Sequence, residues 1–279
     1  MASRRLPTPC EAAVRRHDPD RYFATLFAPA ALRPHLFALY AFNYEIARVG
    51  EAVREPMMGE IRLQWWREAV ESARDGRPRE HEVARALAQM FASAVLPLEL
   101  FDAMIEARRN DLDPSPFADL PSLEAYADAT SGNVMRLGAR ILGAGERYDG
   151  LAREAGIAYA LAGLLQAIPY HAARGAVMLP RDMLEAGGLS RDDVLTGRDP
   201  DRLRTVIAAI AERARTKLAA ARRLPRPRQA LAAFLPAALV PLKLRRLTAA
   251  GFDPFRHKAE VPLHRRQLAL LSAALRGSL

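Results

Sequence analysis

Two aspartates that stand close together offer the first candidate for chemistry in this chain. Asp111 and Asp113 lie two residues apart in the stretch RRNDLDP, and carboxylate oxygens are the ligands that hard divalent cations prefer. A polar stretch that runs into a proline is also typical of a helix end. We interpret the pair as a helix end rather than as a metal site.

The remaining polar motifs give weaker signals. Ser190 and Asp193 have the spacing of a helix-capping pair, and GAGER at Gly143 follows a predicted helix rather than a strand, which indicates a turn. The six histidines are scattered, and the single cysteine, Cys10, cannot form an internal disulfide. The chain has no zinc-protease helix, phosphate-binding loop or nucleophile elbow. We therefore expect no cofactor and a reducing compartment.

Charge is distributed unevenly along the 279 residues. From Arg204 to the end there are sixteen Lys and Arg against three Asp and Glu, a net charge of +13, whereas the first 203 residues carry −4. Such a basic segment fits an anionic membrane surface, an acidic protein, or simply solvated helix faces. Aromatic residues are not interleaved with the basic clusters, so a nucleic-acid partner is the least favoured.

Two segments bear on membranes and targeting. The N-terminal residues are rich in arginine but lack the apolar core of a secretory signal, and we expect residues 1–18 to be a flexible N-terminal segment. The run from Ala155 to Ala173 contains no charge and has 19 residues, close to the roughly 20 that span a bilayer. It also contains glycine, glutamine, proline and histidine, so we predict a buried helix.

Apolar residues recur at helical spacing along most of the chain, and the alternation typical of strands is almost absent. We therefore expect the residues above to lie on or between helices. Asp199 followed by Pro200 predicts a helix start, with an apolar stripe at Ile207, Ile210, Ala214, Leu218 and Ala221. A second helix over 56–75 is predicted to bury Ile61, Trp65, Ala69 and Ala73 and to stop at Gly76. A third is predicted to begin with Ser122 as its cap and to end at Gly143. The sequence thus predicts one all-α domain over 1–279.

Four segments in a fixed order carry a family resemblance. They are RYFATLFAPAALRPHLFALYAFNYEIARVGE, RLQWWREAVESARDGRPREHEVARAL, LEAYADATSGNVMRLGARILG and LLQAIPYHAARGAVMLPRDML. In order and spacing they resemble the squalene/phytoene synthase superfamily over roughly residues 20 to 225. The resemblance implies an isoprenoid-synthase-like single-domain helical bundle around an apolar cavity. It also implies two aspartate-rich motifs that hold magnesium ions and, through them, a prenyl diphosphate.

Both aspartate motifs are altered in this chain. At the first, Ala47 and Arg48 occupy the leading aspartate positions and only Glu51 keeps a carboxylate. At the second, Ala167 and His171 replace the two aspartates. Magnesium requires oxygen ligands, and a cation at position 48 would repel it. We therefore expect no metal, no catalytic residue, and no prenyl-diphosphate synthase activity.

The altered positions define the candidate site. Residues three or four apart share a helix face, so the walls of the former active site are expected on two helices. Within one, Pro169 should kink the chain and present Tyr170 or His171 at a changed angle, and Arg174 is a candidate anion contact. The small residues Gly163 and Ala167 either leave a pocket open at the former active site or let the two helices pack together and fill it. The candidates for cavity or partner binding are Tyr40, Asn43, Tyr44, Gly163, Gln166, Pro169, Tyr170 and Arg174.

The variant motifs point to one branch of the family. FALYAFNYEIARV, RLQWWREAVE and IPYHAARGAVMLP are similar to the branch associated with assembly of the respiratory NADH:quinone oxidoreductase, complex I. The resemblance implies a protein or lipid partner, such as a complex I subunit or assembly intermediate, at the cytoplasmic face of a bacterial inner membrane or at the mitochondrial matrix side. The alternatives are a divergent prenyltransferase acting on isoprenoid diphosphates, and a carrier for a quinone or other isoprenoid lipid.

Overall fold

The chain folds into a bundle of α-helices, as the sequence predicted. The computed structural model describes residues 7–53, 55–255 and 261–279, and within these ranges the only β-pairing is an isolated bridge between Phe117 and Pro180. The α-helices are α1 Pro9–His17, α2 Pro19–Thr25, α3 Arg33–Ala47, α4 Val49–Ala52, α5 Pro56–Arg74, α6 Glu82–Ser93, α7 Leu98–Ala107, α8 Leu120–Ala127, α9 Asn133–Ile141, α10 Asp149–Gln166, α11 Ile168–Ala172, α12 Arg181–Ala186, α13 Arg191–Thr196, α14 Pro200–Arg223, α15 Leu231–Phe234, α16 Val240–Ala249 and α17 Leu263–Arg276. The shorter turns are the 3₁₀ segments η1 Arg108–Leu112, η3 Glu146–Tyr148, η4 Arg228–Ala230 and η5 Leu235–Leu239, and the π-helical turn η2 Asp128–Gly132.

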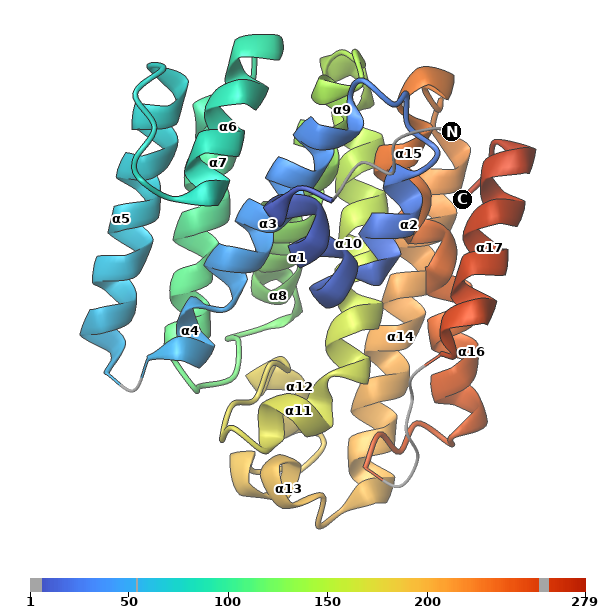
Figure 1. Ribbon diagram of the computed structural model, residues 1–279. Helices are drawn as coiled ribbons and strands as arrows, with labels where there is room; N and C mark the ends of the chain where they lie inside the picture. Colours follow the sequence, from blue (N-terminus) through green and yellow to red (C-terminus); the bar gives the residue numbers. More distant parts are fainter. Residues whose placement is uncertain (1–6, 54, 256–260) are drawn as a thin grey trace.

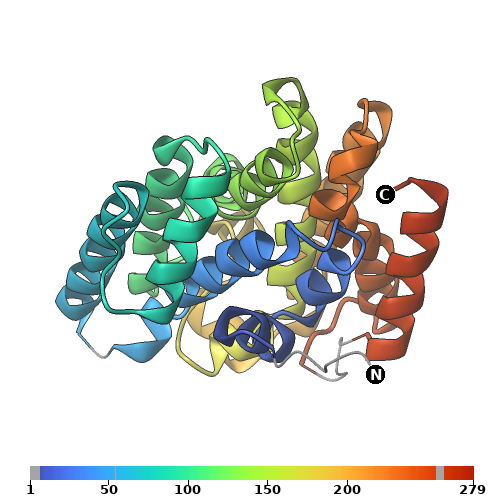
Figure 2. The same ribbon diagram turned by 45° about the horizontal axis from the view of Figure 1, so that its top comes forward.

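A central pair of long helices, α10 and α14, organises the bundle, and the two pack along their lengths. In Figure 1, α5, α6 and α7 lie on one side of this pair, and α16 and α17 lie on the other. The short helices α11, α12 and α13 lie together at the lower end of α10. Figure 2, turned by 45°, keeps α5 and α17 at opposite edges of the molecule.

Local signals in the sequence set several helix ends. The Asp199 side chain accepts a hydrogen bond from the Arg202 amide at 3.2 Å, at the start of α14, and the predicted apolar stripe of α14 is buried. Ser190 and Asp193 form the predicted capping box at α13. Each cap satisfies amide groups that have no partner within the helix, so these two predictions are confirmed.

Two expectations about local structure are wrong in detail. Helix α5 buries Leu63, Trp66 and Val70 beside Ala69 and Ala73, whereas Ile61 is 55% exposed. The apolar residues of α5 lie on two adjacent stripes. Packing against α6 and α7 buries the stripe that contains Leu63, Trp66 and Val70. The cap of α8 is the Asp119 side chain, which accepts from the Ser122 amide at 2.8 Å. Ser122 is therefore a first-turn residue rather than the cap.

The N-terminal segment differs from the expectation of flexibility over residues 1–18. Residues 9–17 form α1, which packs on α3 and buries Cys10 and Val14. Pro9 in the first turn and the Thr8 side-chain cap favour this helix. Residues 1–6 of the expected flexible segment lie outside the described residues.

The charge-free run from Ala155 to Ala173 lies inside the bundle rather than in a bilayer. It makes up the last two thirds of α10 and all of α11, and Ala155, Leu161 and Leu165 are buried. None of the helices in the described ranges is both long enough and apolar enough to cross a membrane. The expectation of a buried helix is confirmed, with a break after Gln166.

Candidate functional site

Two helix breaks face each other across the site. Helix α3 ends at Ala47 and the chain turns at Arg48 into α4, while α10 ends at Gln166 and α11 starts at Ile168. Pro169 lies in the first turn of α11, where a missing amide hydrogen costs little. The predicted break at the proline is therefore present, and it turns α11 away from the line of α10.

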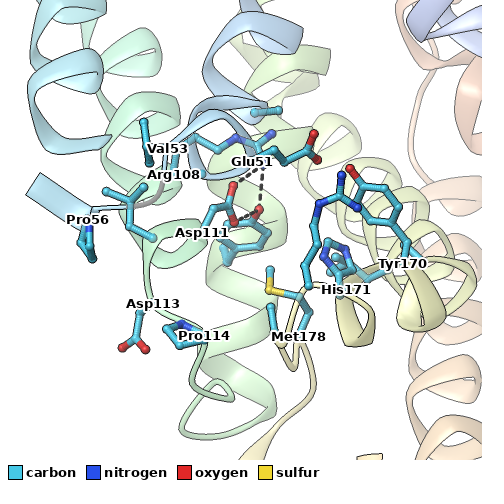
Figure 3. Close-up of a pocket in the computed structure, with 18 residues that line it drawn as sticks. Glu51, Val53, Pro56, Arg108, Asp111, Asp113, Pro114, Tyr170, His171 and Met178 are labelled. Atoms are coloured by element: carbon cyan, nitrogen blue, oxygen red, sulfur yellow. Dashed lines mark hydrogen bonds and ion pairs between the residues drawn. The ribbon is translucent and has the colours of Figure 1, made fainter. Parts of the chain in front are cut away.

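A pocket of about 460 Å³ lies between these breaks. Figure 3 shows Glu51 and Asp111 on one side of it and Tyr170 and His171 on the other. The helices have thus not closed on each other, although both walls carry alanine. The lining residues are Ala47, Gly50, Glu51, Val53, Pro56, Arg108, Asp111, Leu112, Asp113, Pro114, Tyr126, Leu164, Ala167, Tyr170, His171, Arg174, Ala176 and Met178.

Backbone contacts fix the two sides of the pocket relative to each other. A Cβ atom on Gly50 would lie 2.5 Å from the Asp111 carbonyl oxygen, so only glycine lets α4 approach η1 this closely. Below the pocket, the Val177 amide donates to the Pro114 carbonyl at 3.3 Å and the Arg181 amide donates to the Phe117 carbonyl at 2.7 Å. The segment after η1 is therefore tied to the segment after α11.

One pocket wall is a buried network of three side chains. The Arg108 Nη1 donates to Asp111 Oδ2 at 3.1 Å and to the Tyr126 hydroxyl at 2.7 Å, and that hydroxyl donates to Asp111 Oδ1 at 2.7 Å. Burial raises the pKa of Tyr126, and the Asp111 carboxylate raises it further. The Arg108 Nε is buried without a partner among the described residues. Both Asp111 oxygens are therefore already occupied by protein groups.

The opposite wall presents an aromatic ring between two charges. Burial, and then a hydrogen bond to the Glu51 carboxylate, raise the pKa of Tyr170 to about 12. The Arg174 guanidinium lies 3.9 Å from the centre of the Tyr170 ring, a cation–π contact. Arg174 forms no ion pair with any residue that the structure describes. Its charge is thus available at the mouth of the pocket.

His171 lies in the pocket as a neutral group. Burial lowers the pKa of His171 below its usual value, and Arg174 lowers it further, while Asp111 and Glu51 oppose the shift. An imidazole with a lowered pKa is uncharged at neutral pH and both donates and accepts hydrogen bonds. His171 is therefore suited to a neutral polar contact.

The pocket does not have the donor set that a magnesium cluster requires. Ala47 and Ala167 have no ligand atom, and the Asp111 oxygens are bound to Arg108 and Tyr126. Within residues 7–53, 55–255 and 261–279, no group of three or more His, Cys, Asp and Glu side chains is arranged to hold a metal ion. The residues present do not fit the magnesium ions that the resemblance implies.

Several candidates from the first altered motif lie outside the pocket lining. Tyr40 is 2% exposed and its ring lies 5.7 Å from the Arg21 guanidinium. Asn43 supports the wall from behind, with its Oδ1 accepting from Arg108 at 3.5 Å. Tyr44 stacks on His17 with ring centres 4.2 Å apart.

The Arg48 side chain points away from the pocket, whereas the motif alignment placed it at the former metal site. Its guanidinium lies 5.6 Å from the Tyr44 ring centre and 3.7 Å from the Glu45 carboxylate, and it does not line the pocket. The positive charge in the pocket comes instead from Arg108 and Arg174. The expected repulsion of a metal by Arg48 is therefore not the relevant interaction.

Most residues of the second altered motif lie where the sequence predicted, at the pocket. Ala167, Tyr170, His171 and Arg174 line the pocket, whereas Gln166 does not. Gly163 is half-buried, and a Cβ atom there would meet nothing within 4 Å. Its lack of a side chain thus leaves open space near the pocket end of α10.

Sequence reasoning missed the Arg108, Asp111 and Tyr126 network. Asp111 was noticed as part of an acidic pair, but it lies 60 residues from Glu51 in the chain. The available signal was the proximity of two arginines and two aspartates in RRNDLDP. Nothing in the spacing linked that stretch to Tyr126.

Comparison with known proteins identifies the family. The model for squalene/phytoene synthase matches residues 14–267, which include both pocket walls. The chain belongs to the squalene/phytoene synthase family. Among family relatives it is 31% identical over 249 residues to complex I assembly factor 6 of Mus musculus, with 88% of this chain and 75% of the relative covered. The Homo sapiens protein matches at the same identity and coverage.

Enzymes of the family are also similar to this chain. The phytoene synthase of Thermus thermophilus is 30% identical over 271 residues, covering 94% of this chain and 90% of the enzyme. The solved structure of the squalene synthase HpnC from Alicyclobacillus acidocaldarius has 28% identity and a TM-score of 0.77, covering 88% of this chain and 94% of the other. The helical bundle of this chain is therefore the fold of the family.

Proposed function

We propose that this protein is a non-catalytic member of the squalene/phytoene synthase family that assists assembly of respiratory complex I. It would act by binding a protein or lipid partner, either a complex I subunit or an assembly intermediate. The proposed location is the cytoplasmic face of a bacterial inner membrane, or the matrix side in a mitochondrion. The 31% identity to complex I assembly factor 6 over 88% of the chain supports this reading.

The pocket chemistry is the observation that carries the proposal. A diphosphate-binding magnesium cluster requires several convergent oxygen ligands. Here Ala47 and Ala167 contribute methyl groups, and each oxygen of the Asp111 carboxylate already accepts a hydrogen bond, from Arg108 or from Tyr126. The pocket instead offers a neutral imidazole and an arginine that lies over the Tyr170 ring and forms no ion pair within the described part of the chain. These features support a role in binding rather than in ionising a prenyl diphosphate.

Gene deletion is the direct test. Loss of the protein is expected to lower the amount of assembled NADH dehydrogenase in isolated membranes, measured by native gel electrophoresis with in-gel NADH oxidation. Another respiratory complex in the same membranes provides the internal control. An unchanged amount of assembled enzyme would contradict the assembly role.

Complementation with a matched pair of variants tests the pocket itself. Arg174→Ala removes the cation at the pocket mouth, whereas Arg181→Ala removes an arginine that is 61% exposed and does not line the pocket. We expect Arg181→Ala to restore complex I fully and Arg174→Ala to restore less than about a third of it, in line with the loss of one charged binding contact. Equal restoration by both variants would show that the partner does not use the pocket.

Enzymatic activity is the second candidate, favoured by the 30% identity to a phytoene synthase over 94% of the chain. In that case Glu51, which lines the pocket and keeps a carboxylate of the first altered motif, would help to hold magnesium. Incubation with farnesyl or geranylgeranyl diphosphate, with and without magnesium, should then give a condensed hydrocarbon product detectable by mass spectrometry. Magnesium-dependent turnover that Glu51→Gln abolishes would overturn the non-catalytic proposal.

Binding of an isoprenoid lipid without chemistry is the third candidate. It is favoured by the apolar part of the lining, which includes Leu112, Leu164 and Met178. Native mass spectrometry of the purified protein would reveal a co-purifying quinone or other isoprenoid. A bound lipid lost on Leu164→Asp, with the fold retained, would assign the pocket to a lipid rather than to a protein.

A further inference from the structure

Helix α17 has apolar residues on two opposite faces. Leu270 and Ala273 are buried against a small cluster that includes Ala24 of α2 and Leu235 and Leu239 of η5. On the other side, Leu268, Leu271 and Leu275 are 62%, 44% and 79% exposed. Their spacing of three and four residues places them on one face. The bundle uses only one side of α17, and the second apolar side is open.

The position of α17 leaves this second face accessible. The helix lies along the edge of the molecule in both views, with no element outside it among those drawn in colour (Figures 1 and 2). A single exposed leucine is common on protein surfaces, whereas several aligned on one helix face indicate an interaction site. The alignment of three leucines therefore requires an explanation beyond folding.

Arginines border the same end of α17. Arg226, Arg228 and Arg276 surround Leu231 and Leu275 in a surface groove of about 530 Å³. The Arg226 Nη1 donates a hydrogen bond to the Arg222 carbonyl oxygen at 2.9 Å, and the Arg276 guanidinium donates one to the Ser272 hydroxyl. None of the three arginines forms an ion pair with a residue in the described part of the chain. Three positive charges thus share one groove without a counter-ion.

Charge complementarity selects the kind of partner. The three groove arginines make this edge of the molecule positive, so a partner of complementary charge is anionic. Arginine stems lie along apolar surface while their guanidinium groups reach phosphates. A helix with a leucine face and flanking arginines lies in the interface of an anionic bilayer, with the leucines among the acyl chains. An acidic protein would satisfy the arginines but would leave a convex row of leucines without a complementary groove.

We propose that this surface docks the protein on an anionic lipid bilayer. The docking surface is defined by Leu268, Leu271, Leu275, Arg226, Arg228 and Arg276. The leucines enter the headgroup region and the arginines bind lipid phosphates. The surface lies on α17 and the η4 turn, apart from the pocket between α4 and α11, so docking does not depend on the assembly role.

Vesicle sedimentation with the full chain tests the proposal. The probes are neutral phosphatidylcholine vesicles and vesicles with about 30% phosphatidylglycerol in 0.1 M salt, where charges about 10 Å apart still interact. We expect at least tenfold tighter binding to the anionic vesicles, and a fall in that binding at 0.5 M salt. Equal binding to both kinds of vesicle, or binding to neither, would overturn the proposal.

Matched variants separate the two parts of the surface. One triple variant removes the leucines: Leu268→Ser, Leu271→Ser and Leu275→Ser together should lower binding to anionic vesicles at least tenfold. A second triple variant reverses the charge: Arg226→Glu, Arg228→Glu and Arg276→Glu together should abolish that binding. The controls are Val95→Ser, which changes a 98% exposed residue far from α17, and Arg62→Glu on exposed α5 surface. Circular dichroism verifies that each variant is folded. Wild-type binding by either triple variant, or equal loss in the controls, would show that the bilayer does not bind here.

Discussion

Two charged regions of the bundle satisfy their polar groups in different ways. Where α2, α10, α16 and α17 meet, the buried Asp20 carboxylate accepts from Arg266 at 2.6 Å and Tyr159 at 3.3 Å and lies 3.5 Å from the Lys243 Nζ. In the pocket, by contrast, among the residues that the structure describes, Arg174 stacks on the Tyr170 ring without an ion pair and the Arg108 Nε has no partner.

The difference separates structural charges from charges that await a ligand. The Asp20 cluster is 4% exposed at its carboxylate and joins segments more than 200 residues apart. A buried carboxylate of this kind must be paired, because removal of one member leaves an uncompensated charge. The pocket differs, since Arg108 is buried and paired with Asp111, whereas Arg174 has no ion pair with a described residue. Loss of the Asp20 carboxylate should therefore cost the most stability, whereas loss of Arg174 should mainly weaken binding.

The largest effect is expected from Asp20→Ala. It leaves Lys243 and Arg266 close together without their counter-ion, and breaking a buried pair in this way costs about 3–5 kcal/mol of unfolding free energy. Urea denaturation measures the loss. The control is Asp201→Ala, whose carboxylate is 84% exposed beside Arg204 and should cost less than about 1 kcal/mol. Similar losses in both variants would remove the distinction between the two regions.

Two glycines of α10 provide the next contrast. A Cβ atom on Gly156 would lie 2.5 Å from the Gly132 Cα of η2, whereas one on Gly163 would meet nothing within 4 Å. Gly156→Ala should cost about 2 kcal/mol through forced backbone movement. Gly163→Ala should stabilise the protein by about 0.5–1 kcal/mol, since alanine is the better helix former. Thermal unfolding of the two variants distinguishes them, and a destabilised Gly163→Ala would mean that the pocket end of α10 is tightly packed.

The hydroxyls of two buried tyrosines sharpen the comparison further. Tyr126 donates to Asp111 at 2.7 Å and accepts from Arg108, so Tyr126→Phe should cost about 1–2 kcal/mol. Tyr159→Phe removes only the longer bond to Asp20, which keeps Arg266, and should cost about 0.5 kcal/mol. Urea unfolding provides both values. The reverse order would show that the pocket network contributes less to folding than its geometry indicates.

The smallest effect is a change in pH dependence at His171. Because its pKa is lowered in the folded protein, the unfolded chain binds the proton more readily, and stability is lost as the pH falls below 6.5. His171→Gln removes this contribution, so its unfolding free energy should fall less steeply between pH 7 and pH 5 than that of the wild type. His264→Gln, on exposed α17 surface, is the control. An unchanged slope in His171→Gln would mean that the imidazole titrates equally in both states.

The sequence specified the fold through local signals that act over a few residues. The caps at Asp199 and Ser190, and the break at Pro169, were predictable because each depends on neighbours three or four positions away. The buried face of α5 was not, because Ile61 and Leu63 are both apolar and only the packing of α6 and α7 selects between them. The cap of α8 was misassigned because Asp119 and Ser122 are both good capping residues.

The site was predictable in part for the same reason. Ala47, Glu51, Ala167 and His171 line one pocket, and the alignment of two helix motifs was enough to group them. Arg108 and Tyr126 come from η1 and α8, and only the tertiary fold brings them to Asp111. The direction of Arg48 depends on Tyr44 and Glu45, which the motif alignment does not represent.

The start of a new short helix at Ile168, with Pro169 in its first turn, affects how recognition at the pocket can be altered. Tyr170 and His171 project from a five-residue helix, while the long α10–α14 packing ends before it. Substitutions on α11 can therefore alter recognition at the pocket without repacking the central helices. This short corner is therefore the natural target for redesign of ligand recognition at the pocket.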